Sequence, residues 1–358
     1  MYLSARSLFF GMQNLDQLID IVMREGASDL HLSSGRRPAI RVAGDLISLA
    51  KHPALSEADT LEILSALVGE DLKKEFLEMH ELDFSYSVKG GSRFRGNAFV
   101  QKGVVGIALR FIPAKVATLE ELNLPPVLET FAMRKQGFFL AVGPVGHGKS
   151  TTLAAMINIV NKQRTEHIVT IEDPIEFVYE EGNSIIDQRE VGADTRDFHV
   201  ALQHAFRQDV DIIMVGEMRG PDTIATAVTA AETGHLVLST LHTNNAAQTV
   251  DRIIDTFPSD QQNQIRAQLS QSLAGIFSQR LIPRISGGVI PAYELLINTT
   301  AVANLIREGR THEINVVIET GAEEGMIHMD RTLAELVRRG EITPENARAY
   351  ATNVDAIK

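Results

Sequence analysis

The sequence predicts an α/β protein with two domains, a large domain built on a parallel sheet and a smaller α+β domain before it. The chain has 358 residues, which is long for a single hydrophobic core. Residues 12–113 mix short amphipathic helices with short strands, whereas the part from Gly137 onward alternates continuous apolar runs with helical stretches. Continuous apolar strands are typical of a parallel sheet that is buried on both faces.

The smaller domain is expected to begin with an amphipathic helix. In NLDQLIDIVMREG, Asn14 can cap the helix and Gly26 can end it. The apolar side chains that share one face are Leu15, Leu18, Ile19, Val22 and Met23. A second helix is expected from Ser56 to Glu78. Residues 1–11 contain an apolar run that is too short for a signal peptide or a membrane span, and they are expected to be a disordered leader.

A predicted hairpin in the smaller domain places two arginines opposite each other. The runs RFRGNAFV and VGIALRF flank Lys102–Gly103, and a turn at that pair brings Arg95 opposite Arg110 on one side of the sheet. Like charges in that position destabilise a strand pair. We therefore expect either an anion between the arginines, such as a γ-phosphate held elsewhere, or two solvated side chains that splay apart.

The larger domain is expected to occupy residues 137–358, after a linker over residues 114–136 that carries a Pro pair and one short helix. Its predicted strands GFFLAVG, HIVTIED, DIIMVGE and HLVLSTLH carry polar groups mainly at their C-terminal ends. Ligands of parallel sheets bind just beyond the carboxyl ends of the strands. These strand ends are therefore the candidate functional site.

Composition and charge exclude several classes of protein. Lys and Arg total 34 against 46 Asp and Glu, which gives a formal net charge of −12. This acidity argues against nucleic acid as the main partner, because a nucleic-acid surface needs an excess of basic side chains. The chain has no cysteine, so it can form neither a disulfide nor a thiolate metal site, which suits a reducing cytoplasm.

Residues 143–150 match the phosphate-binding loop G-x-x-x-x-G-K-[ST] in full, between a predicted strand and a predicted helix. Its backbone N–H groups would cradle phosphates, Lys149 would reach the β and γ oxygens, and the Ser150 hydroxyl would bind Mg²⁺. The His147 side chain is expected to point to solvent or to the base or ribose. The expected nucleotide-binding residues are Gly143, Pro144, Val145, Gly146, His147, Gly148, Lys149, Ser150 and Thr151.

Three further predicted strands end in titratable side chains. DIIMVGE ends in Glu217, which can orient an attacking water and help to position Mg²⁺. TIEDPIEF places Glu172 and Asp173 after a buried strand, and HLVLSTLHT places His242 likewise. A single histidine after a strand is more often a packing residue. Because these strand ends converge with a phosphate loop, we expect Glu172 and His242 to act near the γ-phosphate or the metal.

Together these motifs resemble those of the PilT retraction ATPases of type IV pili, a family within the bacterial secretion ATPase superfamily. The resemblance rests on ASDLHLS, RFRGNAF, GPVGHGKSTTLAAMIN, TIEDPIEF, GEMRG, AAETGHLVLSTLHT, DRIIDTFP and ANLIREGR, and it covers nearly the whole chain. It implies a PAS-like N-terminal domain, a RecA-like P-loop ATPase domain with C-terminal helices, and a hexameric ring that holds ATP between subunits.

The family's functional residues fall on matching positions of this chain. The resemblance implies a phosphate loop at residues 143–150, an acidic box, a catalytic glutamate, a histidine box and two ATP-contacting arginines. These last four elements fall on Glu172 and Asp173, Glu217, His242, and Arg95 and Arg110. ANLIREGR, residues 303–310, resembles a signature that is needed for retraction rather than for hydrolysis.

The resemblance has departures and leaves alternatives. His147 stands where the family usually has a small residue, Gly220 where an acidic residue is common, and Gln203 and Val210 where the family often has Arg and Pro. Extension ATPases of the superfamily usually carry a four-cysteine zinc site, so its absence favours retraction. Alternatives are a pilus assembly or type II secretion ATPase, a DNA-translocating motor, and an accessory subunit that binds nucleotide but barely hydrolyses it.

The expected function is a Mg²⁺-dependent ATPase ring that pulls pilin subunits out of the pilus. ATP and Mg²⁺ are the expected cofactors. The expected partners are further copies of the chain, an inner-membrane platform protein and a paralogous retraction ATPase, with no nucleic acid. The expected location is the cytoplasmic face of the inner membrane, with membrane association only through partners.

Overall fold

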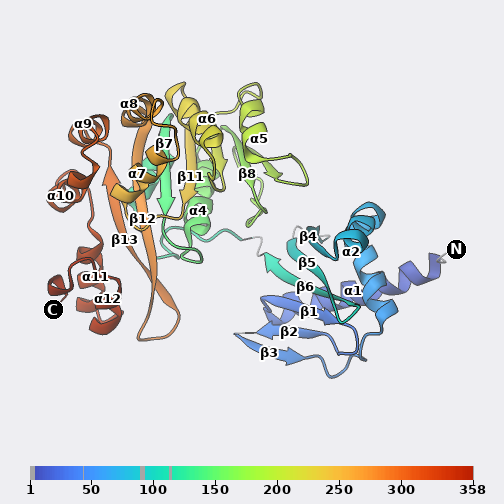
Figure 1. The fold of residues 1–358 in the computed structure, drawn as a ribbon. Helices are drawn as coiled ribbons and strands as arrows, with labels where there is room; N and C mark the ends of the chain where they lie inside the picture. Colours follow the sequence, from blue (N-terminus) through green and yellow to red (C-terminus); the bar gives the residue numbers. More distant parts are fainter. Residues whose placement is uncertain (1–4, 43, 89–92, 113–114, 358) are drawn as a thin grey trace. The chain divides into compact units, whose positions relative to one another are not determined.

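The computed structural model describes the whole chain except residues 1–4, 43, 89–92, 113–114 and 358. The chain divides into two compact units, Met1–Lys115 and Val116–Lys358, each of which is described here by itself (Figure 1). The first unit is α+β and the second is α/β, as the sequence predicts. Within the described residues, no helix has the length and apolar character needed to cross a membrane.

The first unit is a six-stranded antiparallel sheet with two helices packed on one face. Side chains at alternate strand positions meet the apolar sides of the helices α1 (Ala5–Glu25) and α2 (Glu57–Met79), with Leu18, Leu30 and Phe94 among the fully buried ones. In spatial order the strands are β3 (Asp45–Ser48), β2 (Ala39–Val42), β1 (Asp29–Ser33), β6 (Val104–Ile112), β5 (Arg93–Gln101) and β4 (Glu81–Ser87).

For the two helices of the first unit, the start of α2 and the end of α1 agree with the sequence prediction, whereas the start of α1 does not. Ser56 caps α2, and its side chain and that of Asp59 bond each other's backbone N–H groups in a capping box. Gly26, with φ of 62°, follows α1 as expected. The predicted start at Asn14 is wrong, because α1 already runs from Ala5. Of the expected disordered leader, residues 1–4 lie outside the described residues and the rest are helical.

The predicted hairpin is confirmed in its register. Strands β5 and β6 pair with Arg95 opposite Arg110, and the turn consists of Lys102 and Gly103 with φ of 50° and 81°. Two consecutive positive φ angles are what a tight two-residue hairpin turn requires. Both arginine residues are exposed. The polar face of this sheet therefore carries the two cations side by side.

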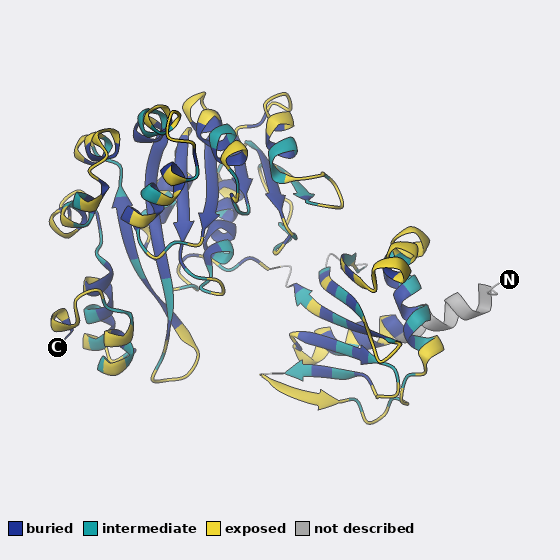
Figure 2. Ribbon diagram, viewed as in Figure 1, coloured by how far each residue is buried: buried dark blue, intermediate teal, exposed yellow. Residues whose placement is uncertain are grey.

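The second unit is a seven-stranded sheet in which all neighbouring strands pair in parallel except β12 and β13, which are antiparallel. Figure 2 shows its central strands as buried along their length, as the continuous apolar runs predict. In spatial order the strands are β13 (Val289–Ile297), β12 (Leu273–Pro283), β7 (Gly137–Val142), β11 (Leu236–Leu241), β10 (Ile212–Val215), β8 (His167–Glu172) and β9 (Ile185–Glu190).

Helices cover both faces of this sheet, because alternate strand residues bury apolar side chains on opposite sides. One face packs against α3 (Val127–Ala132) and α4 (Lys149–Gln163). The other face packs against α5 (Phe198–Ala205), α6 (Pro221–Glu232), α7 (Ala246–Asp255), α8 (Gln262–Ser272), α9 (Thr300–Glu308) and α10 (Ile314–Thr320). The C-terminal end of β12 and the N-terminal end of β13, which lie side by side, pack against α11 (Met329–Arg338) and α12 (Pro344–Tyr350).

The expectation of a linker over residues 114–136 is corrected by the structure. Residues 113–114 lie outside the described part, and the second unit already begins at Val116. Leu128 and Phe131 of α3 are buried against α4 and the sheet, and the Phe131 ring contacts the Phe139 ring of β7 with 4.9 Å between centroids. The segment is therefore part of the core of the second unit.

Candidate active site

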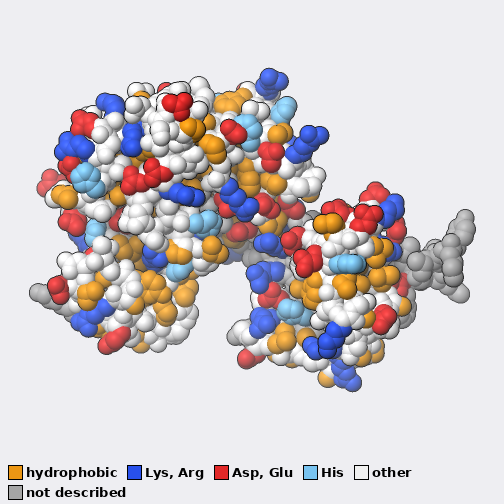
Figure 3. Space-filling view, viewed as in Figure 1, with side chains coloured by type: hydrophobic (Ala, Val, Ile, Leu, Met, Phe, Trp, Pro, Cys, Tyr) orange, Lys and Arg blue, Asp and Glu red, His pale blue; other side chains and the backbone are white. Residues whose placement is uncertain are grey.

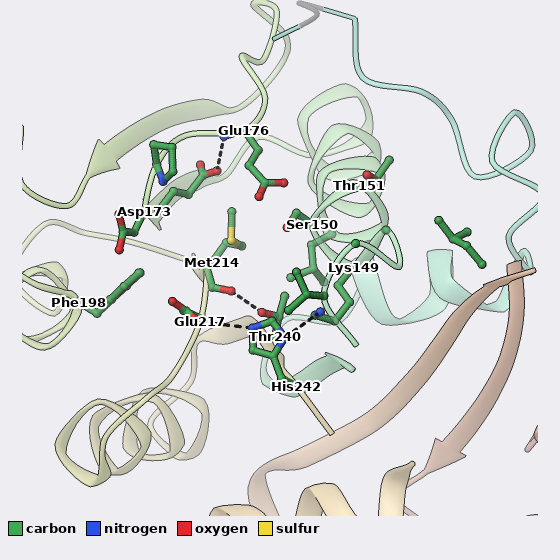
Figure 4. A pocket seen from close by; sticks show the side chains of 18 residues that line it. Lys149, Ser150, Thr151, Asp173, Glu176, Phe198, Met214, Glu217, Thr240 and His242 are labelled. Atoms are coloured by element: carbon green, nitrogen blue, oxygen red, sulfur yellow. Dashed lines mark hydrogen bonds and ion pairs between the residues drawn. The ribbon is translucent and has the colours of Figure 1, made fainter. Parts of the chain in front are cut away.

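The predicted phosphate loop and three of the predicted polar strand ends meet in one cleft of the second unit. The cleft lies beyond the carboxyl ends of β7, β8, β10 and β11 and has a volume of about 460 Å³ (Figure 4). Strands β7, β11, β10 and β8 are direct neighbours, so their ends deliver side chains to the same edge. The predicted residues that line the cleft are Val145, Gly146, Gly148, Lys149, Ser150, Thr151, Glu172, Asp173, Glu217 and His242.

The loop between β7 and α4 is shaped to hold an anion. Gly143, Gly146 and Gly148 have φ angles of 147°, 78° and 81°, which only glycine adopts readily. Gly148 caps α4 without a side-chain hydrogen bond to the first backbone N–H groups. These N–H groups and the positive end of the helix dipole favour phosphate binding at this point.

Lys149 is buried at the start of α4, with 6% of its surface exposed. Its ammonium Nζ donates to the carbonyl oxygens of Gly143 and Pro144, both at 2.9 Å, and to His242 Nδ1 at 3.2 Å. Burial lowers its pKa, and the carboxylates of Glu176 and Glu217 offset this in part. All three ammonium hydrogens thus have an acceptor. A phosphate oxygen would replace one of these acceptors with a charged one, which binds more strongly.

Glu217 follows β10 and is held from two sides. Its carboxylate forms an ion pair with Arg219, and Oε2 lies 3.4 Å from His242 Nε2. Because Lys149 donates to His242 Nδ1, the ring hydrogen of neutral His242 is on Nε2 and faces Glu217. The polar chain Lys149–His242–Glu217 therefore connects the phosphate-binding lysine to the candidate base, as Figure 4 shows.

Glu172 lies at the end of β8 with 6% of its surface exposed. Burial raises the pKa of its carboxyl group, while hydrogen bonds from the Thr170 hydroxyl at 2.7 Å and the Glu176 backbone N–H at 3.2 Å oppose the shift. Gln188 of β9 donates to the same carboxylate at 3.3 Å. These partners fix Glu172 as a polar wall of the cleft, and Asp173 lines it as well.

Gly216 precedes Glu217 where a simple loop ATPase would have an aspartate. A Cβ at this position would lie 3.3 Å from the carbonyl oxygen of Ile171 in β8. The Gly216 N–H donates to that same oxygen at 2.8 Å. Close packing of β10 on β8 therefore leaves little room for a side chain here, and the candidate carboxylate comes one residue later.

The structure adds site residues that the sequence did not indicate. Phe198 of α5, Met214 of β10 and Thr240 of β11 line the cleft, and so does Glu176, which stands within the predicted acidic segment. A second hollow of about 200 Å³ adjoins the phosphate loop at Gly148 and Thr151. Segment 121–124 and strands β12 and β13 line its other sides, with Leu122, Leu124, Leu281, Val289 and Pro291 as apolar members.

The expected orientation of His147 is corrected by the structure. Its Nδ1 accepts the backbone N–H of Leu281 in β12 at 2.8 Å, and its ring is absent from the lining of the cleft among the described residues. Burial lowers the pKa of His147, and the positive charges of Arg280 and Lys149 lower it further. The His147 side chain thus ties the phosphate loop to β12 and does not line the cleft.

Arg95 and Arg110 belong to the first unit, where a carboxylate accompanies them. Asp29 of β1 pairs with Arg110 of β6 across the sheet, with 3.0 Å between Oδ1 and Nε. Burial opposes ionisation of Asp29, but hydrogen bonds from Ser28 and Arg110 outweigh it and lower the pKa of Asp29. Either an external anion or two splayed arginines were expected from the sequence, and this third arrangement, in which a carboxylate of the same sheet pairs with Arg110, was missed. Contact of either arginine with a nucleotide stays a prediction.

The cleft offers oxygen donors for Mg²⁺. The Ser150 hydroxyl and the Glu217 carboxylate both line it, and hard oxygen ligands are those that Mg²⁺ binds beside substrate phosphates. Across the described residues, no three His, Asp or Glu side chains gather in a cage that could hold a metal by themselves. The donor set thus fits an ion that arrives with a phosphate ligand.

The fold and the cleft define a RecA-like nucleotide-binding ATPase, with a phosphate loop after the inner strand β7 and a smaller domain before it. The family model described as type II/IV secretion system protein matches residues 106–349. The chain belongs to this family, and the resemblance seen in the sequence motifs is confirmed.

The similar proteins cover nearly the full length of the chain. The type IV pilus retractation ATPase PilT of Pseudomonas aeruginosa is 46% identical over 94% of this chain and 98% of its own length. The type IV pilus ATPase PilU of the same organism is 42% identical over 96% of this chain and 90% of its own. A crystal structure of the pilus retraction motor PilT with bound ADP superposes with a TM-score of 0.88, at 44% identity over 95% of this chain and 97% of that one.

Proposed function

We propose that this chain is a Mg²⁺-dependent ATPase that powers retraction of type IV pili as a hexameric ring. The single observation that carries the proposal is the cleft in which the phosphate loop, Glu217 and His242 converge. The similarity to retraction ATPases over nearly the whole chain supports the direction of the motor.

In the proposed reaction, Glu217 accepts a proton from the water that attacks the γ-phosphate. Its carboxylate lies at the end of β10, on the edge of the sheet that also carries the phosphate loop. Lys149 and the first N–H groups of α4 bind the phosphate oxygens. When bound, Mg²⁺ would be held by Ser150 and Glu217 and would neutralise charge on the phosphates.

His242 is proposed to couple phosphate binding at the loop to the position of Glu217. In the structure it accepts from Lys149 through Nδ1 and faces Glu217 through Nε2. A phosphate that draws Lys149 away removes the donor to Nδ1, which changes how the ring is held against Glu217. Glu172 is proposed to shape the same cleft, since its buried carboxylate is fixed by three donors.

The adjoining hollow is proposed to receive the nucleotide base. It shares Gly148 and Thr151 with the phosphate loop, and its other walls are mainly apolar, as a base requires. The polar residues that line it are Glu121, Asn123, Thr151, Thr152 and Gln279. The segment once expected to be a linker thus contributes to the proposed nucleotide site.

Arg95 and Arg110 are proposed to reach the γ-phosphate of a neighbouring subunit and to link hydrolysis to domain movement. Both are exposed on the polar face of the first unit, in register on β5 and β6. An arginine supplied in trans stabilises charge in the transition state of phosphoryl transfer. A ring of six subunits would then complete each site between two copies.

The direction of the motor distinguishes retraction from assembly or secretion. The chain has no cysteine for a zinc site of the extension type, and residues 303–310, which lie at the end of α9 and just after it, resemble the retraction signature. We propose that the motor acts at the cytoplasmic face of the inner membrane, on a platform protein and beside a paralogous ATPase. A DNA-translocating motor is disfavoured by the formal net charge of −12, and on the face shown in Figure 3 the basic side chains are interspersed with acidic ones.

The proposal is tested in the parent bacterium by deletion of the gene and complementation with wild type or Glu217→Gln. Retraction predicts that the deletion strain and the Glu217→Gln strain carry more surface pili than wild type and do not twitch. A strain without surface pili would contradict retraction and favour assembly. Normal pili and normal twitching would contradict both motor functions.

A further inference from the structure

The phosphate loop is held by two groups of β12 that lie more than a hundred residues away, the Gln279 side chain and the Leu281 backbone N–H. His147 Nδ1 accepts the Leu281 backbone N–H at 2.8 Å, and the His147 carbonyl accepts Gln279 Nε2 at 2.9 Å. The loop motif leaves the position of His147 open to any residue, so nothing in phosphate binding itself calls for a histidine. Its ring instead serves the contact with β12.

Gln279 extends this contact to the helix that follows the loop. It is 3% exposed, and its Oε1 accepts the Thr152 hydroxyl of α4 at 2.6 Å. Since the His147 carbonyl can only accept, the nitrogen of the amide must face it and the oxygen must face Thr152. Gln279 thus joins the loop and the first turn of α4 to one strand.

The phosphate loop packs so closely on β12 that a side chain at either motif glycine would clash with Gln279. A Cβ at Gly143 would lie 2.4 Å from the Gln279 carbonyl oxygen, and one at Gly148 would lie 2.9 Å from Gln279 Nε2. The two motif glycines therefore also allow β12 to approach the loop closely. We call His147, Thr152, Gln279 and Leu281 the loop clamp.

The clamp needs an unprotonated Nδ1 on His147. A protonated imidazole has two N–H donors and no acceptor, so it would face the Leu281 N–H donor to donor. The charged groups that act on the ring are Arg280 of β12 and Lys149 of α4, both cations. Together with burial they keep the ring neutral near pH 7, which preserves the hydrogen bond to Leu281.

We propose that His147 is a positioning residue for the phosphate loop. Its unprotonated Nδ1 accepts a hydrogen bond from β12 and so holds the loop in its binding shape, and Gln279 of β12 supports the same contact. This inference rests on the proposed nucleotide binding at the same loop. It does not assign His147 any contact with phosphate. Loss of the acceptor is expected to release the loop from β12 and to weaken binding of phosphates, while α4 and the sheet stay folded.

The test measures the affinity of the full chain for MgADP by titration calorimetry at pH 7.5. His147→Leu removes the acceptor, and His147→Asn offers a side-chain oxygen near the place of Nδ1 that does not titrate in this range. We expect at least a tenfold loss in His147→Leu and recovery of most of it in His147→Asn. Gln279→Leu is expected to weaken binding as well, and Lys149→Ala is the reference without binding.

A second measurement follows the affinity from pH 7.5 to pH 5. ADP itself titrates in this range, so the quantity compared is the ratio of wild-type to His147→Asn affinity. The clamp predicts that this ratio falls as the pH falls, because only wild type loses its acceptor. This readout keeps the test decisive even where His147→Leu or Gln279→Leu does not fold, as judged by circular dichroism.

The outcomes separate the clamp from the proposed function. Unchanged affinity in folded His147→Leu, or a constant ratio between pH 7.5 and pH 5, would overturn the clamp while nucleotide binding stands. Equal failure of wild type and Lys149→Ala to bind MgADP would overturn the proposed nucleotide site and the clamp with it. Weak binding by His147→Asn equal to that of His147→Leu would also count against a role for the acceptor.

Discussion

At the scale of single residues, the chemistry of the cleft depends on the carboxylate of Glu217. We expect Glu217→Gln to lower kcat for ATP hydrolysis by about 10²–10⁴-fold, the usual contribution of a general base. KM for ATP should change little, because Lys149 and the loop still bind the phosphates. The measurement is steady-state phosphate release. Glu181→Gln is the matched control, since Glu181 is exposed and lies outside the cleft; equal rates in all three proteins would contradict the assignment.

A second residue, His167, predicts a pH dependence of stability. Burial lowers the pKa of His167, but hydrogen bonds to the Asp187 carboxylate at 3.0 Å and the Asp209 carbonyl at 3.1 Å outweigh it and raise the pKa overall. Because the pKa of His167 is higher in the folded than in the unfolded protein, protonated His167 stabilises the fold. This stabilisation is complete below the unfolded-state pKa of about 6.5 and is lost as the pH rises through the folded-state pKa.

The corresponding measurement compares urea midpoints of wild type and His167→Gln at pH 6 and pH 9. We expect the advantage of wild type to be larger at pH 6 by about 0.5 kcal/mol. The value is small because the Asp187 side chain is 63% exposed and solvent screens the pair. The same advantage at both pH values would show that protonation of His167 does not stabilise the fold.

At the scale of elements, the packing of α3 on β12 can be tested at Gly275. A Cβ there would lie 2.7 Å from the Phe131 ring and 2.8 Å from the Leu296 carbonyl oxygen. We expect Gly275→Ala to destabilise the second unit by about 1–3 kcal/mol through overpacking, measured as a lower thermal midpoint. Gly220→Ala is the control, since a Cβ there meets nothing within 4 Å; an equal or smaller effect at Gly275 would contradict the packing.

The elements also show which features the sequence could predict. The register of β5 and β6 followed from the turn at Lys102 and Gly103, because a two-residue turn fixes every pair above it. The site followed from Lys149 and Glu217, because parallel strands end at one edge of the sheet. Such predictions need only local patterns and the rules for connecting strands.

Other features depend on contacts between distant parts of the chain. Gln279 meets His147 across 132 positions of sequence, and Asp29 meets Arg110 across 81, so neither pattern is visible in any local window. The start of α1 at Ala5 was missed because Asn14 looked like a sufficient cap. Phe131 looked like part of a connection, since Pro125 and Pro126 interrupt the apolar pattern that precedes it.

At the scale of the whole molecule, the proposed ring predicts that two inactive variants can complement each other. Arg110→Ala should lose activity by removing the arginine, and Glu217→Gln by removing the base. When the two proteins are mixed and allowed to exchange subunits, some sites pair an intact Arg110 with an intact Glu217. We expect hydrolysis to return in the mixture. Activity that stays at the sum of the two separate proteins would place both residues in the same subunit's site.

The most direct test of the central claim is the rate of Mg²⁺-dependent ATP hydrolysis per subunit as the protein concentration rises, with Glu217→Gln measured alongside. The account predicts a specific activity that climbs with concentration as rings assemble and that is absent from the variant. A specific activity that stays flat in a monomer would contradict sites shared between subunits. No hydrolysis by wild type at any concentration would contradict the assignment of the cleft as an ATPase site.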